Sequence, residues 1–145
     1  LANKPQPSYL RLDKSSNYKI HKKKMKLHPG KWIKVYDSKL KNKKKNIYLT
    51  TGAVIEYVRN KITKKKIKNL NLYSIPLWSM KSKKTQIKKI SKFNKIYVVE
   101  DHLQDGGFQS WLNESYTSSK LISKSLNEKV IYKLGSQSFL MRNIK

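Results

Sequence analysis

The sequence predicts an α/β domain of three layers, in which a mostly parallel central sheet of about five strands lies between two layers of helices. Short β-rich runs alternate three times with stretches of helical periodicity after residue 46. The connections are short, as in right-handed βαβ crossovers, which place helices on the faces of a parallel sheet. The unbroken apolar run IYVV at 96–99 is typical of a parallel strand that is covered on both faces.

The first part of the chain predicts extended segments joined by basic loops. Residues 9–12 (YLRL) alternate after two prolines, which favour extended conformations. A basic stretch then closes at the turn signal Pro29-Gly30. Residues 32–36 (WIKVY) are expected to form a short strand, and the lysine-rich stretch 37–46 a loop or hairpin.

Regular alternation begins with a strand at 47–50 that ends at Thr51-Gly52. A helix is expected over 53–67 because its apolar residues recur on one stripe. A second strand at 70–75 stops at Pro76. The apolar residues of the helical stripe are Val54, Ile55, Val58 and Ile62.

The second half predicts two more helices and two more strands. A helix capped by Ser82 precedes the strand at 96–99, and another begins at about Gly107. Residues 130–134 (VIYKL), ended by Gly135, are expected to form the last strand. The apolar positions are Ile87, Ile90 and Phe93 in the first helix and Phe108, Trp111, Leu112 and Tyr116 in the second.

The charge is strongly positive, with 34 Lys and Arg against 8 Asp and Glu and a formal net charge of +26. Such a balance favours an anionic partner such as a nucleic acid. However, only Arg11, Arg59 and Arg142 are arginines, whereas nucleic-acid readers use arginine for bidentate contacts. Residues with AT-rich codons are abundant and those with GC-rich codons scarce, which indicates an AT-rich genome and explains much of the lysine. Codon usage does not explain why acidic residues are so few.

Other properties of the composition exclude several classes of protein. The chain has no cysteine, so it forms neither disulfides nor thiolate metal sites. No run approaches the roughly 20 apolar residues of a membrane span, and the first residues lack the apolar centre of a signal peptide. Leu1 stands where an initiator methionine is expected, so we expect a piece of a longer protein. Its default compartment is cytoplasmic.

The triplet Glu100-Asp101-His102 is the strongest candidate site, because ligands bind at the carboxyl ends of strands in open parallel sheets. These residue types suit acid–base catalysis or metal binding. A metal needs further ligands, however, and His21 and His28 lie in the basic linker. No G-x-S-x-G motif supplies a nucleophile. We therefore expect the acids to form turn and cap hydrogen bonds at the following helix, with no catalytic or metal-binding role.

Two glycine-containing turns are candidates for anion binding. Gly106-Gly107 precedes a helix, and Thr50-Thr51-Gly52 follows a strand. Neither turn lies in a G-x-G-x-x-G or G-x-x-x-x-G-K-[ST] motif. We expect close helix packing or positive φ angles to explain these glycines.

Several blocks together resemble the C-terminal part of the transketolase family of thiamine-diphosphate enzymes. The resemblance covers residues 7 to about 135 and is most specific in the EDH…GGF block. Two stretches depart from the family pattern: IPLWSMKSKK at 75–84 replaces K-P-x-D, and Gln109 replaces the second small residue of G-G-x-G. The matching blocks are PSYLRLDK, Gly30-Lys31-Trp32, IYLTTGAVIEYV, NLNLYSIP and IYVVEDHLQDGGFQSWLNE.

The resemblance implies a division of the chain into three parts. Residues 1–12 correspond to the last strand of a truncated pyrimidine-binding domain. Residues 13–45 correspond to a basic linker with the first strand of the sheet, and residues 46–145 to the transketolase C-terminal-like α/β domain.

The resemblance also implies a structural and dimerisation domain of an enzyme of carbohydrate metabolism that transfers a ketol or keto-acid group. The cofactor would be thiamine diphosphate with magnesium, bound by the full-length enzyme and not by this chain. Arg11 matches the arginine that holds the substrate phosphate in the sugar-phosphate enzymes. His102, Gly106 and Gly107 match the motif as loop and dimer-region structure. The partners would be the remaining enzyme domains or a separate subunit, in a homodimer.

Two alternatives from other classes remain open. The charge favours a basic nucleic-acid-binding α/β domain, which would contact nucleic acid mainly through lysine. The related domain of the dehydrogenase complexes suggests a docking module for an acidic partner. Neither alternative involves a membrane.

Overall fold

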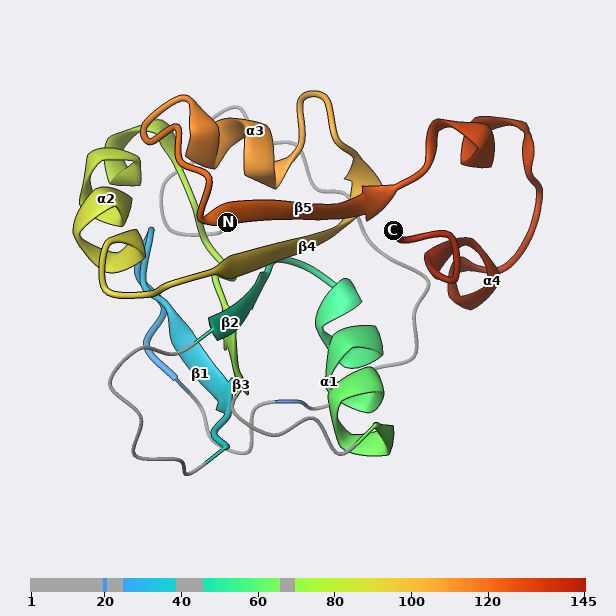
Figure 1. Cartoon of the computed structure of the whole chain (residues 1–145), viewed down its shortest axis with the longest axis horizontal. Coiled ribbons are helices and arrows are strands. Elements are labelled where there is room, and N and C mark those ends of the chain that lie inside the picture. The colour runs from blue at the N-terminus through green and yellow to red at the C-terminus, as the bar shows by residue number, and fades with distance from the viewer. Residues whose placement is uncertain (1–19, 21–24, 39–45, 66–69) are drawn as a thin grey trace, which may run out of the picture.

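A computed structural model describes residues 20, 25–38, 46–65 and 70–145 of the chain, and its centre is a five-stranded sheet (Figure 1). The strand order is β1-β3-β2-β4-β5. β1 runs antiparallel to β3, and all other neighbours are parallel. The strands are β1 (Ile33–Tyr36), β2 (Asn46–Thr50), β3 (Leu70–Ser74), β4 (Ile96–Leu103) and β5 (Leu121–Leu126).

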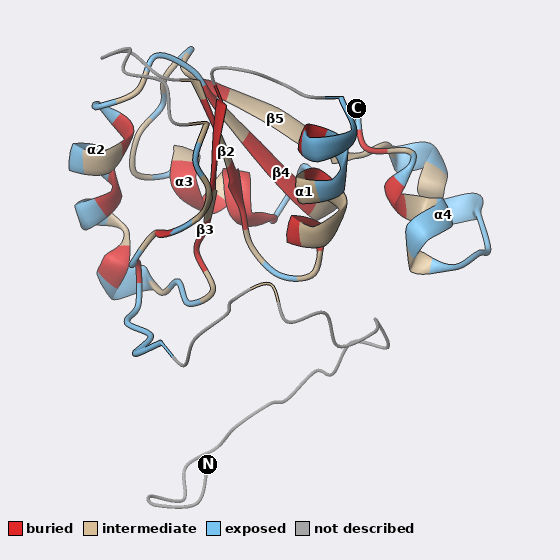
Figure 2. Ribbon diagram, turned by 90° about the horizontal axis from the view of Figure 1, so that it is seen from below, coloured by how far each residue is buried: buried red, intermediate tan, exposed pale blue. Residues whose placement is uncertain are grey.

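Helices cover both faces of this sheet, which confirms the predicted three-layer α/β fold. α2 and α3 lie on one side of the buried strands, and α1 and α4 lie on the other (Figure 2). Within the described part of the chain, no helix has the length and apolar character needed to cross a membrane. The helices are α1 (Val54–Lys64), α2 (Lys84–Ile90), α3 (Phe108–Asn113) and α4 (Gln137–Met141), with the 3-10 turns η1 (Met80–Ser82) and η2 (Glu128–Tyr132).

The hydrophobic core is divided by the sheet into two clusters. One lies under α2 and α3 and includes Ile90, Phe108 and Leu112. The other lies under α1 and α4 and includes Val58 and Met141. Alternate residues of the strands therefore face different clusters, as the pleat of a doubly covered sheet requires.

The stripe predicted for the first helix is confirmed in α1. Val54, Ile55, Val58 and Ile62 are all buried against the sheet. Burial of each such side chain contributes roughly 1.5–3 kcal/mol to stability. Asn60 and Lys64 of the same helix lie on the opposite face, which is exposed to water.

β1 is fixed to the rest of the domain by a polar contact with α2. Trp32 Nε1 donates to Gln86 Oε1 at 2.6 Å, and Gln86 is fully buried. The Trp32 ring stacks on Phe93 at 5.9 Å between ring centres. Gly30 has φ of 74°, and a Cβ at this position would lie 2.7 Å from Ser82 Cβ, so the tight turn before β1 needs glycine.

The second helix differs in detail from the prediction. Ser82 ends η1, where its side chain accepts the Ser79 backbone N–H at 3.0 Å, and α2 begins two residues later. Ile90 is fully buried as expected, but Ile87 is exposed. The buried position on this face is taken instead by Gln86, because Trp32 satisfies its side chain.

The strand predicted at 130–134 is wrong, and the actual last strand, β5, lies nine residues earlier in the chain. Asn127 caps a 3-10 helix by accepting the Lys129 N–H at 2.9 Å, so the β-rich residues that follow form η2. Leu134 beyond it is 98% exposed, which no interior strand would allow. After η2 and α4 the chain returns to the sheet, where Ile144 bridges Leu126 (Figure 1).

Candidate functional site

Glu100 lies at the centre of the candidate EDH site and is fully buried between β4 and α3. Its carboxylate accepts the backbone N–H of Phe108 at 2.6 Å and that of Gln109 at 3.3 Å. These are two of the N–H groups that a helix leaves unpaired at its amino end. Glu100 therefore joins β4 to α3 as a buried helix cap, which is the role expected for it from the sequence.

The pKa of the Glu100 carboxyl is raised above the ordinary value of 4.5. Burial is the main cause because it disfavours the charged form. The two backbone hydrogen bonds from Phe108 and Gln109, and the charge of His102, act in the opposite direction, while Asp101 adds a small rise. Desolvation thus outweighs the stabilisation of the anion at the amino end of the helix.

The glycine pair allows the helix to approach this carboxylate closely. A Cβ on Gly107 would lie 2.8 Å from Glu100 Cδ and 2.9 Å from the Leu103 carbonyl oxygen, so no larger residue fits. Gly106 has φ of 69°, a left-handed conformation that glycine adopts without strain. Close packing and positive φ, the two explanations favoured by the sequence, each account for one glycine of the pair.

Asp101 and His102 do not join Glu100 in a single site. Asp101 accepts the Gln137 side-chain N–H at 3.5 Å, so it contacts α4 on the other side of the sheet and not the amino end of α3. His102 is exposed. Across the described residues, no cluster of three His, Asp or Glu side chains could hold a metal ion.

The Thr50-Thr51-Gly52 turn is held by contacts with β3 and the residue after it. Thr50 Oγ1 donates to the Tyr73 carbonyl at 3.3 Å, and Thr51 Oγ1 donates to the Ile75 carbonyl at 3.0 Å. Gly52 has φ of 68°. Since both hydroxyls donate to backbone carbonyls at the end of β3, the geometry fits a strand-to-helix connection rather than an anion site.

Two of the residues considered from the sequence, Arg11 and His21, lie outside the described residues. His28 is exposed in the turn before β1, where its carbonyl oxygen accepts the Lys31 N–H at 3.1 Å. It lies in a different part of the fold from the EDH triplet.

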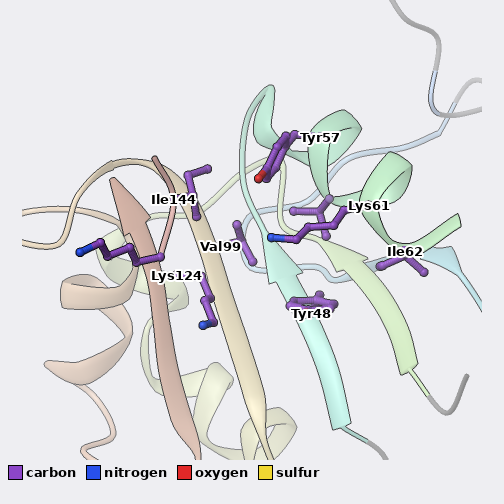
Figure 3. Close-up of a pocket in the computed structure, with 9 residues that line it drawn as sticks. Tyr48, Tyr57, Lys61, Ile62, Val99, Lys124 and Ile144 are labelled. Carbon is purple, nitrogen blue, oxygen red and sulfur yellow. The ribbon is translucent and has the colours of Figure 1, made fainter. Parts of the chain in front are cut away.

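A cavity of about 120 Å³ on the α1 side of the sheet was not predicted from the sequence (Figure 3). Its wall combines apolar, tyrosine and lysine side chains from α1, three strands and the end of the chain. A lysine within a strand, Lys124, could have indicated this cavity from the sequence. The strand that carries Lys124 was not predicted, so the cavity was not predicted either. The lining residues are Tyr48, Tyr57, Val58, Lys61, Ile62, Val99, Lys124, Ile144 and Lys145.

Comparisons with known proteins find similarity in structure alone. No family model matches the sequence, and no curated protein matches it. The structure is similar to that of a split-gene transketolase described as an inactive β4 tetramer, with a TM-score of 0.57 and 12% sequence identity. The match covers 83% of this chain and 39% of the transketolase chain, so this chain spans less than half of its length.

The sheet topology and this match together show an α/β fold similar to that of part of a transketolase. The fold implied by the sequence blocks is therefore confirmed, although an identity of 12% shows the fold alone.

Proposed function

We propose that this chain is the C-terminal structural and dimerisation domain of a transketolase-like, thiamine-diphosphate-dependent enzyme and is inactive by itself. The observation that carries the proposal is the structural match across 83% of the chain to less than half of a transketolase. The EDH…GGF block supports it, because its order in the sequence resembles the same part of that family.

The chemistry of the EDH block supports a structural role in this enzyme. Glu100 already accepts two backbone N–H groups, and its pKa is raised by burial. A buried carboxyl that caps a helix cannot reach a substrate in solvent. Asp101 contacts Gln137 and His102 is exposed, so neither residue forms a catalytic pair with Glu100.

The remaining parts of the proposed enzyme would lie in other domains or in a separate subunit. Those parts would bind thiamine diphosphate with magnesium, and Arg11 would hold the substrate phosphate in the assembled enzyme. The similar split-gene transketolase forms an inactive β4 tetramer. By analogy, we infer that this chain forms a homo-oligomer and becomes part of an active enzyme only with its partner domains.

Isothermal titration calorimetry with thiamine diphosphate and magnesium tests the proposal. We expect no saturable binding to the isolated chain. Light scattering is expected to show a dimer or larger oligomer. Tight cofactor binding, or a monomer at high concentration, would contradict the proposal. Reading the coding sequence upstream of Leu1 is an independent check, since we expect it to encode a pyrimidine-binding domain or to adjoin a gene that does.

A basic nucleic-acid-binding domain is the second candidate, and the net charge of +26 is the observation that favours it. Exposed lysines such as Lys84 and Lys88 on α2 could contact phosphate groups. The salt dependence of binding, argued in the Discussion, separates sequence-specific recognition from lysine electrostatics.

A further inference from the structure

The cavity on the α1 side of the sheet lies where the helical layer is incomplete. α1 covers the sheet from one side of the opening, and the end of the chain returns from the other side at Ile144 (Figure 3). Val99 of β4 lies at the centre of the opening. The space between the two covering segments has a volume of about 120 Å³.

The register of the sheet explains why a lysine lines this cavity. Val99 pairs with Thr50 on one side and with Lys124 on the other, and neighbours in register point to the same face. Lys124 is therefore placed on the α1 face, where a doubly covered sheet normally carries an apolar residue. It is half-buried there.

Lys61, Lys124 and Lys145 line the cavity, so its charge is positive even though Lys145, the last residue, also carries the terminal carboxylate. Lys61 contributes from α1 and has its Nζ 5.5 Å from the centre of the Tyr57 ring. Among the described residues, the lining contains no Asp or Glu, and the two ion pairs join Lys34 to Asp37 and Lys83 to Glu114. Lys61 is exposed and Lys124 is half-buried, and no acidic side chain lines the cavity, so an anion bound here would gain from both lysines.

The rest of the wall suits a flat apolar group. Tyr48 and Tyr57 present aromatic rings, and Val99, Ile62 and Ile144 present aliphatic side chains. Burial raises the pKa of Tyr48, and neighbouring Tyr97 raises it further, so its hydroxyl stays neutral and can donate to an anion. A cavity of about 150 Å³ accepts benzene in other proteins, so one aromatic ring is close to the size limit here.

We propose that this cavity binds a small aromatic carboxylate, with the ring against the two tyrosines and the carboxylate at Lys61 and Lys124. Figure 3 shows Tyr57 and Lys61 projecting from α1 on the same side of the cavity, above the strands that carry Tyr48 and Val99. The inference goes beyond the proposed enzyme role and does not depend on it, because it rests only on residues of this chain.

Benzoate, benzamide and acetate are the probes, each titrated into the ¹⁵N-labelled 145-residue chain at constant ionic strength. Benzoate is expected to bind saturably and to shift amide signals of α1, β4 and β5. Benzamide lacks the charge and acetate lacks the ring, so each is expected to bind at least about tenfold more weakly. Equal affinity for benzoate and either control compound, or no saturation with benzoate, would overturn the proposal.

Two pairs of substitutions separate the cavity from the general positive charge. Lys61→Gln with Lys124→Gln is expected to weaken benzoate binding about tenfold or more. Lys84→Gln with Lys88→Gln removes the same charge from α2 on the opposite face and is expected to leave the affinity unchanged. If both pairs weaken binding equally, benzoate is held by net charge and the cavity is no binding site.

Discussion

The carboxylate of Glu100 accepts the backbone N–H of Phe108 at 2.6 Å, from a fully buried position on β4. This contact fixes where α3 begins and how closely it lies against the sheet. The triplet Glu100-Asp101-His102 has residue types that are common in active sites, yet the hydrogen bonds of Glu100 stabilise the fold. Its neighbours Asp101 and His102 share neither its burial nor its partners.

Gly107→Ala is expected to destabilise the domain by about 1–3 kcal/mol, because the new methyl group would overlap the Glu100 carboxylate. Urea denaturation followed by circular dichroism measures the change. Gly106→Asn is the matched control, since asparagine tolerates positive φ and nothing lies within 4 Å of a Cβ there. Equal losses in the two variants would contradict the close contact.

The same contact predicts coupling between two substitutions. In a Glu100→Ala background the carboxylate is gone, so Gly107→Ala is expected to cost less than it does in the wild type. A double-mutant cycle by urea denaturation measures the difference. Strictly additive effects would show that Gly107 is required for another reason.

Stability is expected to depend on pH through Glu100. Its pKa is raised in the folded protein, so the folded state holds this proton more tightly than the unfolded chain. The contribution of Glu100 to stability is therefore full below the ordinary pKa of 4.5, falls as pH rises toward the folded pKa, and is constant above it.

Glu100→Gln removes this titration and provides the test. Urea midpoints of wild type and variant are compared from about pH 4 to about pH 8, where the wild type is expected to lose stability relative to the variant as pH rises. Exposed Glu128→Gln is the control. A wild type that gains stability relative to Glu100→Gln across this range would mean that the pKa is lowered instead.

The regular centre of the fold could be predicted because its local signals agree with its packing. The α1 stripe follows from helical periodicity and β4 from its unbroken apolar run. The stripe is buried as expected, as are Ile96, Val98 and Val99 of β4. Residues 121–126 were missed because Ser-Lys-Ser interrupts their apolar pattern, although β4 supplies the partner that makes them a strand. Residues 130–134 have β-rich composition but no partner among the described strands, so the Asn127 cap decides the conformation of the residues that form η2.

The roles of buried polar residues depend on partners far away in the sequence. Glu100 could be assigned to the helix that follows it, because both partners lie within nine residues. The burial of Gln86 could not be predicted, since its side-chain oxygen is paired by Trp32, 54 residues away, and its amide group also donates to the Gly30 carbonyl, 56 residues away. The cavity also requires the register of β5 against β4, which no local pattern contains.

Gln86→Leu is expected to cost about 1–3 kcal/mol, because Trp32 Nε1 and the Ser82 carbonyl oxygen would lose the side chain that pairs them. Thermal or urea unfolding measures the loss. Trp32→Phe in the Gln86→Leu background removes the unpaired indole N–H and is expected to restore part of the stability. A Gln86→Leu protein as stable as wild type would show that these hydrogen bonds contribute little.

Binding to DNA is expected to be weak, independent of sequence and strongly dependent on salt. The charge of +26 comes almost wholly from lysine, which binds phosphate without reading bases. Fluorescence anisotropy with two unrelated duplexes, measured from about 50 mM to about 200 mM salt, should give equal affinities that fall steeply. If α2 faces the DNA, Lys84→Gln with Lys88→Gln should make the slope of log affinity against log salt concentration less steep. The expected change is about 0.9 for each phosphate that the variant no longer neutralises. Selective binding to one duplex that persists at the higher salt would favour a dedicated nucleic-acid-binding domain over the transketolase-like role, because lysine electrostatics alone cannot produce it.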